Sequence, residues 1–180
     1  MAKKQRLDKA IAMQGSLSRS EVKTLIRKGA VTVNGQVVKN ADFGVDFDSD
    51  TVAVQGKELS LSMHIYLMLN KPKGVVSASE DKKLPTVVDL VPKELWRKGL
   101  FPAGRLDKDT TGFVLITDDG EFAHDILSPK KHISKTYHAL VNGTITDEMV
   151  EGFAKGVTIG EDFTLPASLK KISSEEQGDW

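Results

Sequence analysis

Apolar residues at helical spacing open the chain. They recur in this way over residues 6–14, and Gly15 ends the run. Ser18-Arg19-Ser20-Glu21 then has the form of a capping box, in which the serine hydroxyl and the glutamate carboxylate bond free amides of the first helical turn. The pattern therefore predicts two short helices, the second running to Lys28 and ending at Gly29.

Alternating apolar residues next predict short strands. Residues 31–38 form two alternating runs around Asn34-Gly35, which is a strong signal for a hairpin. Residues 51–56 alternate in the same way and predict one more strand. We expect a small first domain over residues 1–56 and a linker over residues 57–63.

The rest of the chain, residues 64–180, mixes strand-like and helix-like runs in what we expect to be a second domain. Glycine, proline and aspartate punctuate these runs, as turns require. The predicted strands are residues 64–70, 75–79, 113–117, 134–143, 157–159 and 169–172. The predicted helical segments are residues 85–91, 93–98, 121–127 and 147–155, with Trp96 as a core residue and Thr146 as a cap.

Composition narrows the class of protein. The 180 residues include no cysteine, so disulfides and a cysteine nucleophile are excluded. No apolar run approaches the roughly 20 residues that span a bilayer. The first residues lack the apolar stretch of a signal peptide, so we expect a soluble, cytoplasmic protein with no membrane partner.

Charge is distributed unevenly along the chain. The net charge is zero, but residues 1–40 hold nine Lys and Arg against two Asp and Glu, a net charge of +7. A basic segment in a neutral protein favours contact with a polyanion, although a solvated helix face is the alternative. The candidate RNA-binding residues are Arg6, Arg19, Lys23, Arg27 and Lys28 in the first domain, and Lys71, Lys130, Lys131 and Lys135 in the second.

A polar loop between two glycines, Gly104 and Gly112, is the candidate site. It stands immediately before a run of large apolar residues, so a rigid strand would support it. Arg105 supplies a cation that would keep the carboxylate of Asp107 ionised, which makes Asp107 a candidate catalytic group. The alternative is that Asp107 caps a turn, which is the role we expect for Asp109, Asp118 and Asp119.

Known cofactor and metal motifs are absent from the sequence. It contains no phosphate-binding loop, no dinucleotide fingerprint and no His-Glu-x-x-His pair. Asp46, Asp48 and Asp50 alternate as in a calcium loop, but Thr51 and Lys57 stand where that loop needs glycine and glutamate. We therefore expect no metal and no cofactor.

Three segments resemble one family. Residues 104–120, from Gly-Arg-Leu-Asp to Asp-Asp-Gly, are similar to the signature loop of the RsuA/RluB type of bacterial ribosomal RNA pseudouridine synthases. Leu69-Asn70-Lys71-Pro72-Lys73-Gly74-Val75-Val76-Ser77 is similar to another motif of these enzymes. Residues 5–55 resemble the small RNA-binding domain first recognised in ribosomal protein S-four.

The resemblance implies an α+β fold: a small helical and hairpin RNA-binding domain, and a synthase domain with a mixed, largely antiparallel sheet flanked by helices. Members of the family continue for several dozen further residues, so we expect residues 64–180 to lack the carboxyl-terminal part of that domain.

The resemblance also implies a chemistry. Pseudouridylation cuts the N1–C1′ bond of uridine and rejoins C1′ to C5 without a cofactor. Asp107 would be the catalytic carboxylate, as a nucleophile or as a base toward C2′. Tyr137 would stack against the target base, although a core aromatic residue is the alternative. Arg105 would fill the space that the base leaves, or pair with phosphate.

Several stretches look more like the small-subunit members of the family than the large-subunit ones, among them Ala103 and residues 153–157. We expect a monomer that modifies 16S rRNA and whose partner is the partly assembled small subunit. A 23S rRNA pseudouridine synthase is the second hypothesis. A non-catalytic RNA-binding or ribosome-assembly module is the third.

Overall fold

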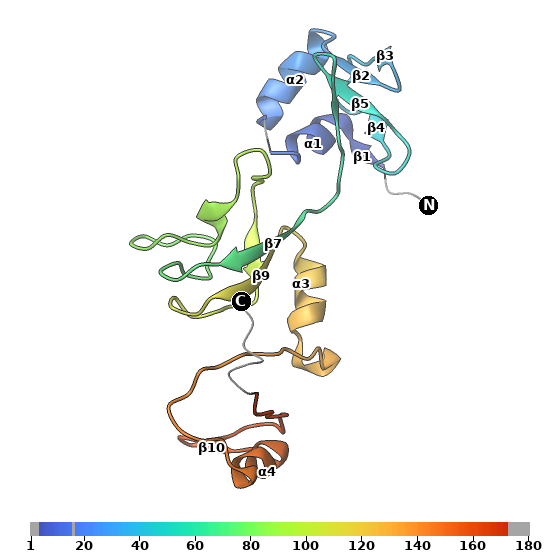
Figure 1. Cartoon of the computed structure of the whole chain (residues 1–180). Coiled ribbons are helices and arrows are strands. Elements are labelled where there is room, and N and C mark those ends of the chain that lie inside the picture. Colours follow the sequence, from blue (N-terminus) through green and yellow to red (C-terminus); the bar gives the residue numbers. More distant parts are fainter. Residues whose placement is uncertain (1–3, 16, 173–180) are drawn as a thin grey trace. The chain divides into compact units, whose positions relative to one another are not determined.

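The computed structural model describes residues 4–15 and 17–172 (Figure 1). The chain divides into two units, Met1–Ile133 and Ser134–Trp180, and each is described by itself. None of the helices in the described residues is long and apolar enough to cross a membrane.

The first unit opens with two helices and a small sheet, as predicted. Its elements are β1 (Gln5–Arg6), α1 (Leu7–Ala12), α2 (Arg19–Arg27), β2 (Val31–Val33), β3 (Gln36–Val37), β4 (Gly44–Val45), β5 (Val52–Val54) and β6 (Lys57–Leu59). The sheet has the antiparallel order β3-β2-β5-β6. The predicted capping box is present, because Ser18 and Glu21 each bond the other's backbone amide. One apolar cluster joins the helices to the strands, including Leu7, Ile26 and Val52.

Two tight turns shape this sheet. Asn34 and Gly35 have φ values of 50° and 79°, as the predicted turn between β2 and β3 requires. Gln55 and Gly56 repeat that conformation between β5 and β6. The residues of β6 were expected in the linker, because Gln-Gly is a weaker turn signal than Asn-Gly.

A three-stranded antiparallel sheet follows, with the order β7-β9-β8. It consists of β7 (Tyr66–Lys71), β8 (Phe101–Ala103) and the central strand β9 (Gly112–Thr117), and Figure 1 shows β7 beside β9. The connecting segments carry η1 (Val88–Leu90), α3 (Gly120–Leu127) and η2 (Pro129–Lys131). The predicted capping role of Asp119 is confirmed, since its carboxylate accepts a 2.9 Å hydrogen bond from the Phe122 amide at the start of α3. Helices and largely antiparallel sheets make this an α+β fold, as predicted.

Residues 75–79 and Trp96 differ from the prediction. The segment forms no strand, and only Val76 makes a single bridge to Thr86. Its side chains instead serve the neighbouring loop and core, as described below. Trp96, predicted in the core, is 45% exposed.

The second unit contains α4 (Asp147–Lys155), β10 (Thr158–Ile159) and β11 (Asp162–Phe163). Thr146 caps α4 by accepting a hydrogen bond from the Met149 amide, as predicted. The strands predicted at 134–143 and 169–172 are not formed in the described residues. Alternation supplies two faces, but a strand also needs a partner for its backbone groups, and the one ladder of this unit's described residues joins β10 to β11.

Candidate active site

The candidate catalytic loop, residues 104–111, joins β8 to the central strand β9. Glycine stands at its start and just after its end, where φ is +113° at Gly104 and +127° at Gly112. Side-chain-bearing residues rarely adopt such values, so both positions favour glycine. The loop is therefore fixed at each end to a strand of the sheet.

Lys71, at the end of β7, holds the far side of this loop. The side chain is fully buried, and its Nζ donates to the carbonyl oxygens of Thr110 at 2.7 Å, Lys108 at 3.0 Å and Pro72 at 3.2 Å. An ammonium group has three donors, and all three are used. Lys71 was predicted to bind RNA phosphate, and the structure corrects this: its ammonium positions the loop and does not reach solvent.

Ser77 and Gly74 hold the same loop from the other recurring motif. The hydroxyl of Ser77 donates to the Leu106 carbonyl at 2.8 Å and accepts from the Leu106 amide at 3.0 Å. The amide of Gly74 donates to the Lys108 carbonyl at 2.9 Å. The two motifs that the sequence singled out separately therefore meet, and one supports the other.

Asp107 and Arg105 remain on the outside of the loop. Leu106 between them packs against the apolar core, while both flanking side chains are exposed. Neither side chain has a hydrogen bond or ion pair within the described residues, so Arg105 makes no direct contact with the carboxylate that it was expected to keep ionised. The carboxylate is thus held by its backbone and left free to meet a ligand.

Tyr137 belongs to the second unit. Its side chain is 64% exposed, and its segment is the one that forms no strand. The alternative of a core aromatic residue is not supported within this unit. Its place against a target base stays a prediction.

Three of the predicted RNA-binding residues surround Asp8, which is fully buried at the start of α1. Arg6 and Arg19 each donate to its carboxylate at 3.1 Å, and the Nζ of Lys23 lies 3.8 Å away. Burial acts to raise the pKa of Asp8, but hydrogen bonds from Arg6 and Arg19 outweigh it and lower the pKa to about 2. These three basic side chains are therefore organised around one buried carboxylate.

This arrangement predicts a pH dependence of stability. Because the folded pKa of Asp8 lies below its ordinary value of 3.8, the carboxylate stabilises the fold above about pH 4 and loses this effect as the pH falls towards 2. The lost stabilisation is about 2 kcal/mol. Urea unfolding of the parent and of Asp8→Asn between pH 6 and 2 checks it: the gap between the two free energies of unfolding should shrink by that amount. A constant gap would contradict the role of Asp8.

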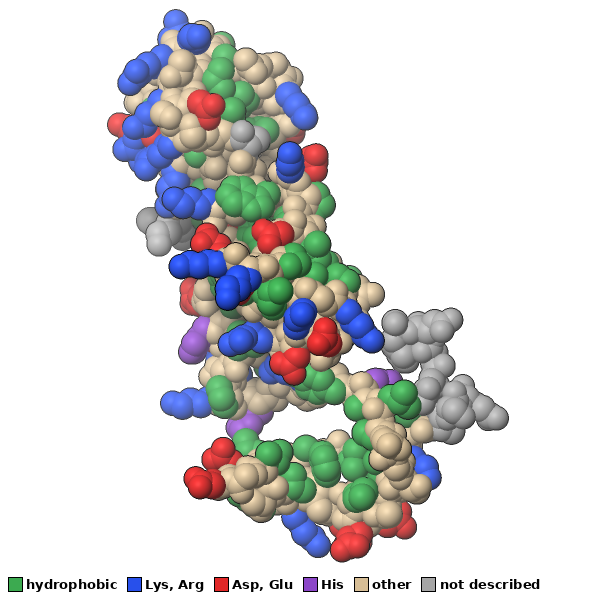
Figure 2. All heavy atoms as spheres, turned by 90° about the vertical axis from the view of Figure 1, so that its left-hand side faces the viewer, with side chains coloured by type: hydrophobic (Ala, Val, Ile, Leu, Met, Phe, Trp, Pro, Cys, Tyr) green, Lys and Arg blue, Asp and Glu red, His purple; other side chains and the backbone are tan. Residues whose placement is uncertain are grey.

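Other predicted basic residues are more accessible. Figure 2 shows Lys and Arg side chains gathered over the upper part of the molecule, which the first helices and strands form. Arg27, Lys28, Lys130 and Lys131 are exposed, and Lys131 lies 3.5 Å from the carboxylate of Asp125. Lys135, in the second unit, is exposed as well.

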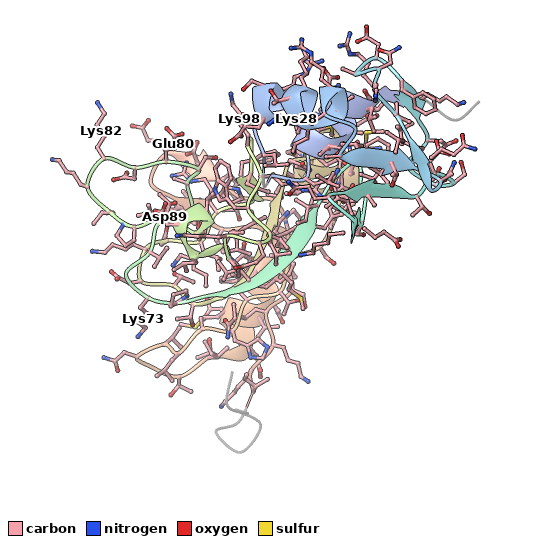
Figure 3. All side chains as sticks on the ribbon, turned by 90° about the horizontal axis from the view of Figure 1, so that it is seen from above. Lys28, Lys73, Glu80, Lys82, Asp89 and Lys98 are labelled. Carbon is pink, nitrogen blue, oxygen red and sulfur yellow. The ribbon has the colours of Figure 1, made fainter. Side chains whose placement is uncertain are left out.

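Lys73 and Lys108 are basic residues that the sequence reasoning did not select. Both are exposed, and Lys73 points away from the ribbon in Figure 3. They lie on the two segments that the bond from the Gly74 amide to the Lys108 carbonyl joins.

The described residues contain no candidate metal site, because no three or more His, Asp or Glu side chains come together that could hold an ion. The chemistry that the loop offers is that of one exposed carboxylate on a fixed backbone, with an exposed guanidinium two residues before it.

Comparison with known proteins agrees with this geometry. The family described as RNA pseudouridylate synthase matches residues 65–177, and the S4 domain matches residues 5–52. The chain belongs to the RNA pseudouridylate synthase family. The synthase region thus includes β7, the candidate catalytic loop and β9, and the S4 region includes the basic helices.

Named relatives place this synthase in the RsuA/RluB type. An uncharacterized RNA pseudouridine synthase of Bacillus subtilis, YtzG, is 44% identical over 97% of the chain and 73% of its own length. Ribosomal small subunit pseudouridine synthase A of Escherichia coli is 43% identical over 93% of the chain and 73% of its own length. Ribosomal large subunit pseudouridine synthase B of Bacillus subtilis is 39% identical over 96% of the chain and 70% of its own length. The synthase is therefore an isomerase of uridine in RNA.

Proposed function

We propose that this synthase converts a specific uridine of 16S rRNA into pseudouridine, as a cytoplasmic monomer acting on the partly assembled small subunit. The observation that carries the chemistry is the exposed Asp107 on a loop held by Lys71 and Ser77. The 43% identity to the small-subunit enzyme supports the substrate. The 39% identity to a large-subunit enzyme supports 23S rRNA as the second candidate.

The reaction needs one well-placed carboxylate. The N1–C1′ bond breaks, the base turns, and a C1′–C5 bond forms, after which C5 loses a proton and N1 gains one. Asp107 begins this sequence either by attacking the substrate covalently or by taking a proton from C2′. Arg105 fills the space of the displaced base or pairs with phosphate, and Tyr137 stacks on the base.

The basic residues of the S4 region hold the RNA by its phosphates. The carboxylate of Asp8 forms ion pairs with Arg6, Arg19 and Lys23. In contrast, Arg27 and Lys28 make no ion pair within the described residues. Arg27 and Lys28 therefore contribute positive charge that no carboxylate offsets within the described residues, together with Lys130 and Lys135 from the rest of the chain. Lys131 contributes less, because it lies 3.5 Å from the carboxylate of Asp125.

Salt dependence tests this assignment. Replacing Arg27 and Lys28 by Gln should lower the slope of log K against log salt by about 1.5, because each phosphate contact contributes roughly 0.7 to 0.9. The matched control replaces Lys82 and Lys83, which are exposed in another loop, and should leave the slope unchanged. Equal slopes for both double variants would remove Arg27 and Lys28 from the RNA contact.

Chemical mapping of pseudouridine tests the function itself. The chain, Asp107→Ala and a version extended past residue 180 are each incubated with protein-free 16S and 23S transcripts and with partly assembled subunits. One new site in 16S material that is lost with Asp107→Ala is the expected result. A site in 23S material alone would favour the second candidate. Tight binding without modification by any version would leave a non-catalytic RNA-binding or ribosome-assembly module.

A further inference from the structure

Arg97 connects the S4 region to the synthase region within the first unit. Its guanidinium donates to the side-chain oxygen of Gln14 at 2.6 Å, to the hydroxyl of Ser62 at 2.7 Å and to the Ser62 carbonyl at 3.1 Å. Gln14 follows α1, and Ser62 lies between the two regions that the family comparisons match. One side chain thus bonds a residue 83 positions away in sequence.

The side chain of Arg97 is shielded from solvent and lies among its polar partners. The residue is only 7% exposed, and its Nη1 lies 3.8 Å from the carboxylate of Asp118. Burial lowers the pKa of Arg97, and Asp118 acts in the opposite direction. A buried guanidinium is strongly destabilising unless its donors are satisfied, so its partners must keep their places.

Gly15 adds a second contact between the same two regions. Its φ is +89°, and a Cβ added there would collide with the carbonyl oxygen of Trp96. The chain leaving α1 therefore passes directly over the backbone next to Arg97. Gln14 also donates to the Ala10 carbonyl at 2.9 Å, which ties the connection to α1 itself.

The synthase end of this connection reaches the strand of the catalytic loop. Asp118 immediately follows β9 and accepts a 3.0 Å hydrogen bond from the Ile65 amide just before β7. Both strands carry the loop at their other ends, through Gly112 and Lys71. Arg97 is therefore bound to the base of the strands whose opposite ends support Asp107.

We propose that Arg97, with Gln14, Gly15, Ser62 and Asp118, forms an interdomain clamp that fixes the S4 region relative to the catalytic loop. This rests on the proposed function: a rigid clamp sets the span between the RNA bound by Arg27 and Lys28 and the uridine that meets Asp107. Arg97 is then a positioning residue that contributes to the choice of uridine, without touching the reacting atoms.

Distances between two spin labels test the clamp without requiring activity. The chain has no cysteine, so Thr24→Cys on α2 and Glu121→Cys on α3, both exposed, give two unique labelling sites. We expect one narrow distance distribution in the parent and a broad one in Gln14→Leu and Arg97→Met. Gln36→Leu makes the same chemical change at an exposed site and should keep the distribution narrow. If Arg97→Met fails to fold, Gln14→Leu decides, because it leaves the Arg97 bonds to Ser62 in place.

RNA binding distinguishes a positioning role from a purely structural one. For a long rRNA fragment that reaches both regions, Gln14→Leu should raise the Kd on the order of tenfold, because a loose connection lowers the effective concentration of the second site. For a short stem-loop around the modified uridine, the Kd should not change. A narrow distance distribution in Gln14→Leu, or an equal loss of affinity for both RNAs, would overturn the clamp. Absence of pseudouridine formation would instead count against the proposed function and leave the spin-label distances, which need neither RNA nor activity, as the test of the clamp.

Discussion

Asp107→Asn should lower the rate of pseudouridine formation by at least about a thousandfold, since the proposed function assigns the central step to this carboxylate. The amide is nearly the same size, but it neither attacks carbon nor accepts a proton at neutral pH. Because the side chain is exposed and has no partner among the described residues, the free energy of unfolding should change by less than about 0.5 kcal/mol. Single-turnover kinetics on the mapped RNA measure the effect.

The matched control for this experiment is Asp109→Asn. Asp109 is exposed in the same loop, two residues further on, and loses the same charge. Its rate should stay within about threefold of the parent. If Asp109→Asn were as inactive as Asp107→Asn, the loss would reflect the charge of the loop and not a catalytic carboxylate.

Lys71→Met should be the most destabilising of the proposed changes. Three carbonyl oxygens lose the buried donor that they share, and such unsatisfied groups together cost about 3 kcal/mol or more. Pseudouridine formation should fall as well, because the loop that carries Asp107 loses its attachment to β7. Urea unfolding and single-turnover kinetics together measure both effects.

Lys73→Met provides the comparison, two residues along the same motif. Its side chain is exposed, so stability should stay within about 0.5 kcal/mol of the parent. Weaker RNA binding with unchanged stability is expected for Lys73→Met alone. The same pattern in Lys71→Met would return Lys71 to the role of a phosphate ligand.

Local signals in the sequence predicted the elements that depend on local contacts. The capping box of α2, the Asn34-Gly35 turn and the apolar run of β9 involve residues that are close in sequence, so their patterns are legible without the fold. The short strands β6 and β8 were not predicted, because the three residues of each show no clear alternation and acquire strand structure from a neighbouring strand.

In the candidate site, too, features that depend on local sequence were predicted and features that depend on distant contacts were not. The resemblance identified the loop with Arg105 and Asp107, but the buried role of Lys71 depends on bonds to residues 37 and 39 positions away. Arg97 carries no motif at all, and its partners come from three separate stretches. In residues 134–143 the alternation was correct as a pattern, yet no strand follows, because a pattern does not supply a pairing partner.

The attachments of the catalytic loop share one property. Lys71, Ser77 and Gly74 all bond backbone atoms of the loop and none of its side chains. The side chains of Lys108 and Thr110 can therefore change without releasing the loop, as long as the backbone keeps its course. Substitutions in the loop side chains are therefore expected to leave the backbone that carries Asp107 in place.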